Sequence, residues 1–349
     1  MAALVDESLN APGTPPPAVV TRRVRFPVLA FLIRRLALGL VTLLVASVLI
    51  FVATNALPGN VSEVVLGKHA SPPLVAALDK QLGLDRPLTA RYFSWLGGLV
   101  HGDLGQSAVQ LANGVPDAPV SKIIGTPLRN SLVLALGTLV FLVPLSLIAG
   151  TVAAVQAGKA SDYAVSYPAL ILGSLPEFVL GTFLILIFFT QLHWLQPVAG
   201  VPPGTSPLDN VKALILPIMT LLGVAIAFCS RQVRAGVIEA LRQDYVMMAR
   251  LSGLRERRVL VRYALRNALA ASIQTFAQAV QYLFGGIIVV EALFGYPGIG
   301  SLLVQAVTLR DVTEVQAITI VLAAVYILIN IVADLLVVLL VPRLRTGLS

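Results

Sequence analysis

The sequence has few of the residues from which disulfide frameworks, metal sites and catalytic centres are built. It contains one cysteine, Cys229, and three widely separated histidines, which excludes a disulfide framework and a cysteine–histidine metal cluster. The phosphate-binding pattern G-x-x-x-x-G-K-[ST] is absent, because the pairs Gly67-Lys68 and Gly158-Lys159 lack the earlier glycine and the following hydroxyl. No Ser/His/Asp arrangement stands out. We therefore expect no catalytic, cofactor or metal site on this chain.

Charged residues are also scarce. They make up 12% of the chain against 57% hydrophobic residues, and the mean hydropathy is +0.88. A soluble protein of 349 residues could not bury that much apolar surface, whereas a lipid bilayer accommodates it. The net charge of +8 could suggest nucleic acid, but the positive residues cluster between apolar runs, as membrane topology signals do. We predict an integral membrane protein with no nucleic-acid partner.

Six apolar segments are long enough to cross a bilayer, which takes about twenty residues. The predicted spans are residues 35–54, 131–158, 163–192, 213–234, 268–290 and 315–341. The third is interrupted by Pro168 and by Pro176-Glu177, which can mark a kink or a break. We therefore predict an all-α fold with six transmembrane helices, a membrane domain over residues 31–349, and a disordered, Pro/Ala-rich tail over residues 1–30.

The distribution of lysine and arginine predicts the orientation. Arginines are concentrated before the first span, within residues 236–267 and after the last span, whereas the alternate segments carry positive charges spread over a longer length. The positive-inside rule then places both termini and residues 236–267 in the cytoplasm. Residues 55–130 would lie outside, where helical apolar spacing over 74–82 and 88–99 predicts a small helical cap. The turn signal GYPGIG predicts a short outer helix after it.

Some polar side chains lie inside the predicted spans. Gln274, Gln278 and Gln281 are spaced i, i+4 and i+7, so they share one face of the fifth helix. Such a stripe is unfavourable against lipid, and it can either line a water-filled translocation path or form hydrogen bonds within the bundle. Both interpretations remain open.

Three carboxylates lie in or beside the spans. We expect Arg343 or Arg345 to neutralise Asp334, and we interpret Glu177 and Glu291 as boundary residues. A secondary transporter or channel is the alternative function from a different class. It would need coupling carboxylates or histidines at mid-membrane or an inverted repeat, and the sequence offers neither.

The most charged stretch, residues 236–267, carries seven arginines with apolar residues at helical spacing. Arg250–Gly253 has the pattern of a helix end with Gly253 as the stop signal, and Arg255 begins a second short helix. Ala249 and Gly253 are small, which would let a partner's surface approach closely, and the neighbouring arginines could pair with acidic groups on that partner. The alternative is an ordinary loop that obeys the positive-inside rule.

The motif DYVMMARLSG, followed after nine residues by YALRNAL, resembles the EAA loop of binding-protein-dependent ABC importer permeases, in particular B-type subunits of the dipeptide/oligopeptide branch. In the EAA segment this chain has Met247 at the glutamate position, and it has Arg266 at the position of the final proline. Further segments resemble family signatures in the same order: FVATNALPGN, LGLDRP, GDLGQS, SLPEFVLG, EALFGYPGIG and DLLVVLLVPRLR.

The resemblance implies a type I ABC importer permease fold in a prokaryotic cytoplasmic membrane. It implies a second homologous permease, two ATPase subunits that bind ATP and magnesium, and an extracytoplasmic substrate-binding protein as partners. The substrate would be a di- or oligopeptide, with glutathione, a nickel chelate or another small solute as alternatives. The implied ATPase-coupling residues are Asp244, Tyr245, Met248, Ala249, Arg250, Gly253, Leu254 and Arg258.

Overall fold

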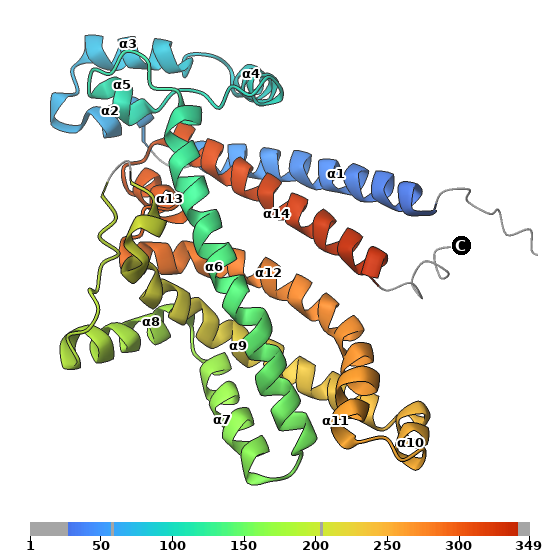
Figure 1. Ribbon diagram of the computed structural model, residues 1–349. Helices are drawn as coiled ribbons and strands as arrows, with labels where there is room; N and C mark the ends of the chain where they lie inside the picture. The colour runs from blue at the N-terminus through green and yellow to red at the C-terminus, as the bar shows by residue number, and fades with distance from the viewer. Residues whose placement is uncertain (1–26, 57–58, 203–204, 341–349) are drawn as a thin grey trace, which may run out of the picture.

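Long apolar helices dominate the structure, a computed structural model that describes residues 27–56, 59–202 and 205–340 (Figure 1). Five helices are long and apolar enough to cross a membrane, or six if one bent pair counts as a span. The five are α1 (Pro27–Asn55), α6 (Val120–Val155), α9 (Val211–Leu241, preceded by the short η3, Pro207–Asn210), α12 (Arg266–Phe294) and α14 (Val312–Leu340). The described residues form no β-strand, only an isolated bridge between Gln106 and Pro119. The predicted all-α membrane fold is confirmed, while most of the predicted tail lies outside the described residues.

The bent pair occupies the position of the third predicted span. It consists of α7 (Ala160–Ser174) and α8 (Glu177–Ile185, continued by the π-helical η2, Leu186–Gln191), and the bend is 107°. Leu175 is extended (φ −89°, ψ 135°) because the following Pro176 excludes the helical conformation there. Pro168, by contrast, lies within α7 without breaking it. Of the two interruptions that the sequence contains, only the second is a break.

Two helices continue beyond their predicted spans. α6 begins at Val120 rather than at residue 131 and includes Lys122 and Arg129, and α9 continues past residue 234 to Leu241. Charged residues limit the segment that can lie in hydrocarbon, but they do not end a helix. The extension of α6 connects the bundle to α5 (Ala108–Ala112), and the extension of α9 connects it to α10 (Asp244–Leu251).

The predicted cap is present at one end of α6 (Figure 1). It contains α2 (Val61–Leu66), η1 (Gly67–His69), α3 (Pro72–Leu82), α4 (Leu88–Val100) and α5 (Ala108–Ala112). Buried Asp311, just before α14, holds it on the bundle: its Oδ2 accepts hydrogen bonds from Ser107 Oγ (2.6 Å) and the Val109 N–H (3.0 Å). The cap is therefore attached to the last span as well as to α6.

The corner between α12 and α13 (Ile299–Thr308) depends on Glu291, whose side chain is fully buried. Its Oε1 accepts a hydrogen bond from Ser131 Oγ (2.5 Å), and its Oε2 accepts one from the Gly300 N–H (2.8 Å). Tyr296 Oη donates to the carbonyl of Asn130 (2.8 Å). Glu291 lies near the end of its span, as expected of a boundary residue, and its carboxylate also joins α6, α12 and the start of α13.

α1 and α14 lie side by side and form an arm beside the other spans (Figure 1). A Cβ added to Gly39 would lie 2.8 Å from Ile327, which shows how closely the two helices approach. Asp334 on α14 forms an ion pair with Arg35 on α1 (3.0 Å). Its partner is thus a residue of the first span, whereas Arg343 and Arg345, the expected partners, lie outside the described residues.

Replacing Glu291 should destabilise the α12–α13 corner. In Glu291→Leu, the Gly300 N–H and Ser131 Oγ would lose their buried acceptor, which costs about 3 kcal/mol in total. We expect a lower melting temperature of the purified protein in detergent. The matched control is Glu63→Gln, because Glu63 is exposed on the cap. Equal melting temperatures for the two variants would contradict the assignment.

Candidate functional site

The short helix α10 (Asp244–Leu251) lies at the end of the bundle opposite the cap (Figure 1). Only Arg242 and Gln243 separate it from α9 in sequence, and the extended Gln243 (φ −73°, ψ 146°) makes α10 a separate helix after a short turn. Val246 and Ala249 on its inner side are buried and pack in a cluster with Val233 and Val237 of α9. This packing fixes α10 to the bundle.

The outer side of α10 is apolar and exposed. Met247, Met248 and Leu251 are 58%, 62% and 77% exposed, and Tyr245 beside them is 37% exposed. Asp244 in the first turn is also exposed and lies near the positive end of the helix dipole. A compact group of exposed, large apolar side chains surrounded by polar residues indicates a binding surface for another protein.

Ala249 does not belong to that surface. Its side chain is 6% exposed and lies within the cluster between α9 and α10, and Leu254 packs against the same cluster. The interpretation of Ala249 as a small residue that lets a partner approach is therefore wrong for this residue. Val246 and Ala249 are three residues apart, a spacing that places both on one face of a helix, and this spacing could have predicted that Ala249 faces α9. Met247 and Leu251, which that interpretation omitted, are among the most exposed residues of α10.

Gly253 ends the helical turn, as predicted, and has a left-handed φ of +74°. Its N–H donates to the carbonyl of Arg250 (2.9 Å), and the Arg250 guanidinium pairs with Glu256 (Nε–Oε1 2.9 Å). Next come α11 (Glu256–Arg258) and the π-helical η4 (Val259–Leu265). The residues that line a depression beside the turn are Gly253, Leu254, Arg255, Arg257, Arg258, Val261 and Arg262. A basic concave surface thus adjoins the apolar face of α10.

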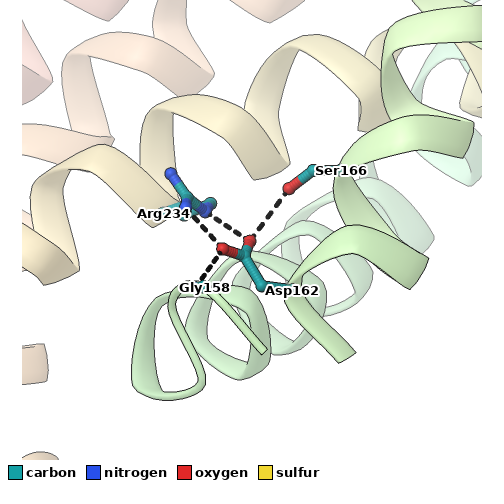
Figure 2. A network of polar contacts seen from close by, with 4 residues as sticks. All are labelled: Gly158, Asp162, Ser166 and Arg234. Carbon is teal, nitrogen blue, oxygen red and sulfur yellow. Dashed lines mark hydrogen bonds and ion pairs between the residues drawn. The ribbon is translucent and has the colours of Figure 1, made fainter. Parts of the chain in front are cut away.

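An ion pair that the sequence analysis missed joins two other helices near this end (Figure 2). Asp162 in the first turn of α7 accepts hydrogen bonds from Arg234 of α9, at 2.7 Å from Nε and 2.6 Å from Nη2. Its carboxylate also accepts from the Gly158 N–H (2.9 Å) and Ser166 Oγ (3.0 Å). The two residues are 72 positions apart, and no local pattern links them. The pair fastens the α6–α7 turn to α9.

The glutamine stripe of α12 faces away from the chain's own bundle. Gln274 and Gln278 are exposed and Gln281 is half-buried, and none of the three side chains forms a hydrogen bond with another described residue. Tyr282 continues the same face and is 51% exposed. A Cβ added to Gly285, one turn from Gln281, would meet no atom within 4 Å. Among the described residues the stripe therefore forms no side-chain hydrogen bonds, and its amides can contact water, a solute or a second subunit.

The fold, the α10 surface and the polar stripe agree with a transport component, and the comparisons identify the family. Residues 143–346 match the family described as binding-protein-dependent transport system inner membrane component. Residues 28–119 match the N-terminal region of binding-protein-dependent transport system membrane components. The chain belongs to this family of ABC transport permeases and is a multi-pass membrane protein.

Curated relatives align over nearly their whole length. A putative peptide transport system permease of Brucella abortus is 34% identical over 90% of this chain and 99% of the relative. A glutathione transport system permease of Shigella flexneri and a di/tripeptide transport system permease of Pseudomonas aeruginosa are each 34% identical, over 91% of this chain and 99% of each relative.

Replacing Asp162 should loosen the α7–α9 contact. In Asp162→Asn, the Arg234 guanidinium loses its anionic partner while the volume of the side chain is kept, so we expect a lower melting temperature. The control is Asp117→Asn, because Asp117 pairs with Lys122 at 3.4 Å on an exposed surface, where ion pairs contribute little. A melting temperature that falls as far in the control as in Asp162→Asn would argue against a special role for this pair.

Proposed function

We propose that this chain is the transmembrane permease subunit of an ATP-driven ABC importer for di- and oligopeptides, and that it forms half of the translocation path. The observation that carries the proposal is the exposed apolar face of α10 beside a basic depression, at the end of a bundle from a binding-protein-dependent family. The names of the relatives, peptide and di/tripeptide permeases, support the substrate class.

The complex that we propose contains a second homologous permease, two ATPase subunits and an extracytoplasmic substrate-binding protein. The positive-inside rule favours cytoplasmic termini and a cytoplasmic α10, which would dock on an ATPase through Tyr245, Met248 and their neighbours. The cap would then face the binding protein. ATP hydrolysis would take place on the ATPase subunits, because this sequence has no phosphate-binding loop.

The proposed coupling runs through packed elements. A displacement of α10 would move α9, because only two residues separate them and Val246 and Ala249 are buried against α9. The Asp162–Arg234 pair would carry the movement into α7. The break at Leu175–Pro176 would let α7 move relative to α8. The outcome would be a change in the access of the path to the two sides of the membrane.

The substrate has one alternative with specific support. A glutathione permease is as similar to this chain as the di/tripeptide permease is, and glutathione is itself a tripeptide. The side chains of Gln274, Gln278 and Gln281 can contact the backbone of any peptide, since each offers both a donor and an acceptor. The stripe therefore suits peptides of varied sequence.

A charge on the apolar face of α10 should uncouple the ATPase. Met248→Asp places a carboxylate at the centre of the proposed interface, and we expect ATPase co-purification to fall about tenfold or more. Met248 is 62% exposed, so the isolated subunit should fold normally. The measurement is a pull-down of the complex from detergent-solubilised membranes.

The control for that substitution is Leu74→Asp, which places the same charge on an exposed residue of the cap. It should leave the ATPase bound. ATPase recovery that is unchanged in Met248→Asp would contradict the proposed docking surface.

The glutamine stripe should be reachable from water in the assembled importer. The chain's only cysteine, Cys229, is buried, so Gln278→Cys introduces a single accessible thiol. We expect a membrane-impermeant methanethiosulfonate reagent to modify it in proteoliposomes. Leu328→Cys on α14 is the control, because Leu328 is 59% exposed on an apolar face that we assign to lipid. Failure to modify Gln278→Cys, both with and without ATP, would exclude Gln278 from the path.

A further inference from the structure

Glu177 lies inside the membrane bundle and not at a boundary. It is the first residue of α8, directly after the break, and its side chain is half-buried. A Cβ added to Gly286 of α12 would lie 3.2 Å from Glu177 Oε1, so the carboxylate packs over this glycine. Gly286 precedes Phe294, the end of α12, by eight residues, or about 12 Å along the helix. The boundary interpretation of Glu177 is therefore wrong.

The Glu177 carboxylate has no cationic partner in the part of the chain that the structure describes. Three other acidic residues in or beside the spans have strong partners: Asp334 pairs with Arg35, Asp162 pairs with Arg234, and Glu291 accepts hydrogen bonds from Ser131 and Gly300. A carboxylate in a membrane span is unfavourable unless it meets water, a donor or a cation, and such residues commonly mark solute pathways.

The neighbours of Glu177 connect it to the glutamine stripe. Tyr282 on α12 lies close enough to Glu177 to interact with the carboxylate electrostatically. Tyr282 follows Gln278 by four residues, so it lies on the face that carries the stripe, and it is half exposed. A Cβ added to Gly285 would meet no atom within 4 Å, so the α12 surface between Tyr282 and Gly286 is uncovered, and the half-buried carboxylate over Gly286 lies at its edge.

We propose that Glu177, together with Tyr282, binds the alkylammonium group of the transported solute. The group would be either the protonated amino terminus of a peptide or a lysine side chain. The ammonium would donate charge-assisted hydrogen bonds to the carboxylate, and the Tyr282 ring would add a cation–π contact. The glutamine amides would contact the remaining backbone. This inference rests on the proposed function, because it assigns a subsite within that translocation path.

The test compares peptide uptake by the complete importer in proteoliposomes, with both permeases, the ATPases and the binding protein. Glu177→Gln keeps the shape and removes the charge, Glu177→Asp keeps the charge, and Glu63→Gln is the exposed control on the cap. The peptides are Ala-Ala, N-acetyl-Ala-Lys and N-acetyl-Ala-Ala. Each rate is divided by the wild-type rate for the same peptide, so that the preference of the binding protein cancels.

We expect Glu177→Gln to lower Ala-Ala uptake per ATP hydrolysed about tenfold, with ATPase stimulation by the loaded binding protein retained. Glu177→Asp should keep most of the uptake. If only N-acetyl-Ala-Lys uptake falls, the bound group is the lysine side chain. Equal loss for all three peptides, or for both Glu177 variants, would show a structural role and overturn the proposal, as would wild-type uptake by Glu177→Gln.

The failure of this proposal can be distinguished from failure of the proposed function. A wild-type complex that moves no peptide would reject the importer itself. A wild-type complex that moves Ala-Ala, with an equally active Glu177→Gln variant, would reject only the ammonium subsite.

Discussion

The close approach of α9 to α6 and α8 is the contact on which the rest of the membrane bundle depends. A Cβ on Gly150 of α6 would lie 2.6 Å from the carbonyl oxygen of Ser230, and a Cβ on Gly223 of α9 would lie 2.5 Å from Leu180 of α8. Lipid chains are as apolar as leucine, so helices in a bilayer associate through close packing, which small residues permit. α9 is accordingly the most buried of the spans, and α6, α7, α8 and α12 all pack against it.

This arrangement packs one end of the molecule tightly, whereas the described spans contain one sharp bend, between α7 and α8. Val246 and Ala249 attach α10 to α9, and the Asp162–Arg234 pair attaches the start of α7 to the same helix. α8 instead packs on the other half of α9 and on α12 after the 107° turn. In the coupling that we propose, a displacement that enters through α10 would be absorbed at the break between α7 and α8, at Leu175–Pro176.

Hydropathy predicted the long helices because burial in lipid requires about twenty apolar residues, and that requirement is local in sequence. The contacts that the sequence did not predict join residues that lie far apart in the chain. Arg234 lies 72 positions from Asp162, and Ser131 lies 160 from Glu291, so neither partner can be inferred from spacing. The burial of Ala249 also depends on a neighbouring helix, α9, so it could not be inferred from the residue type of Ala249 and the arginines of its segment. The coupling residues and the path residues themselves remain predictions.

The exposed faces of the spans differ in composition, so the apolar faces and the polar face require different surroundings. α1 and α14 expose leucines such as Leu40 (61%) and Leu328 (59%), as lipid demands. α12 instead exposes Gln274, Gln278 and Tyr282, and a polar face of this kind is unfavourable in hydrocarbon. The described part of the chain covers neither this face nor the apolar side of α10, so both surfaces are available for partner subunits of the binding-protein-dependent transport system.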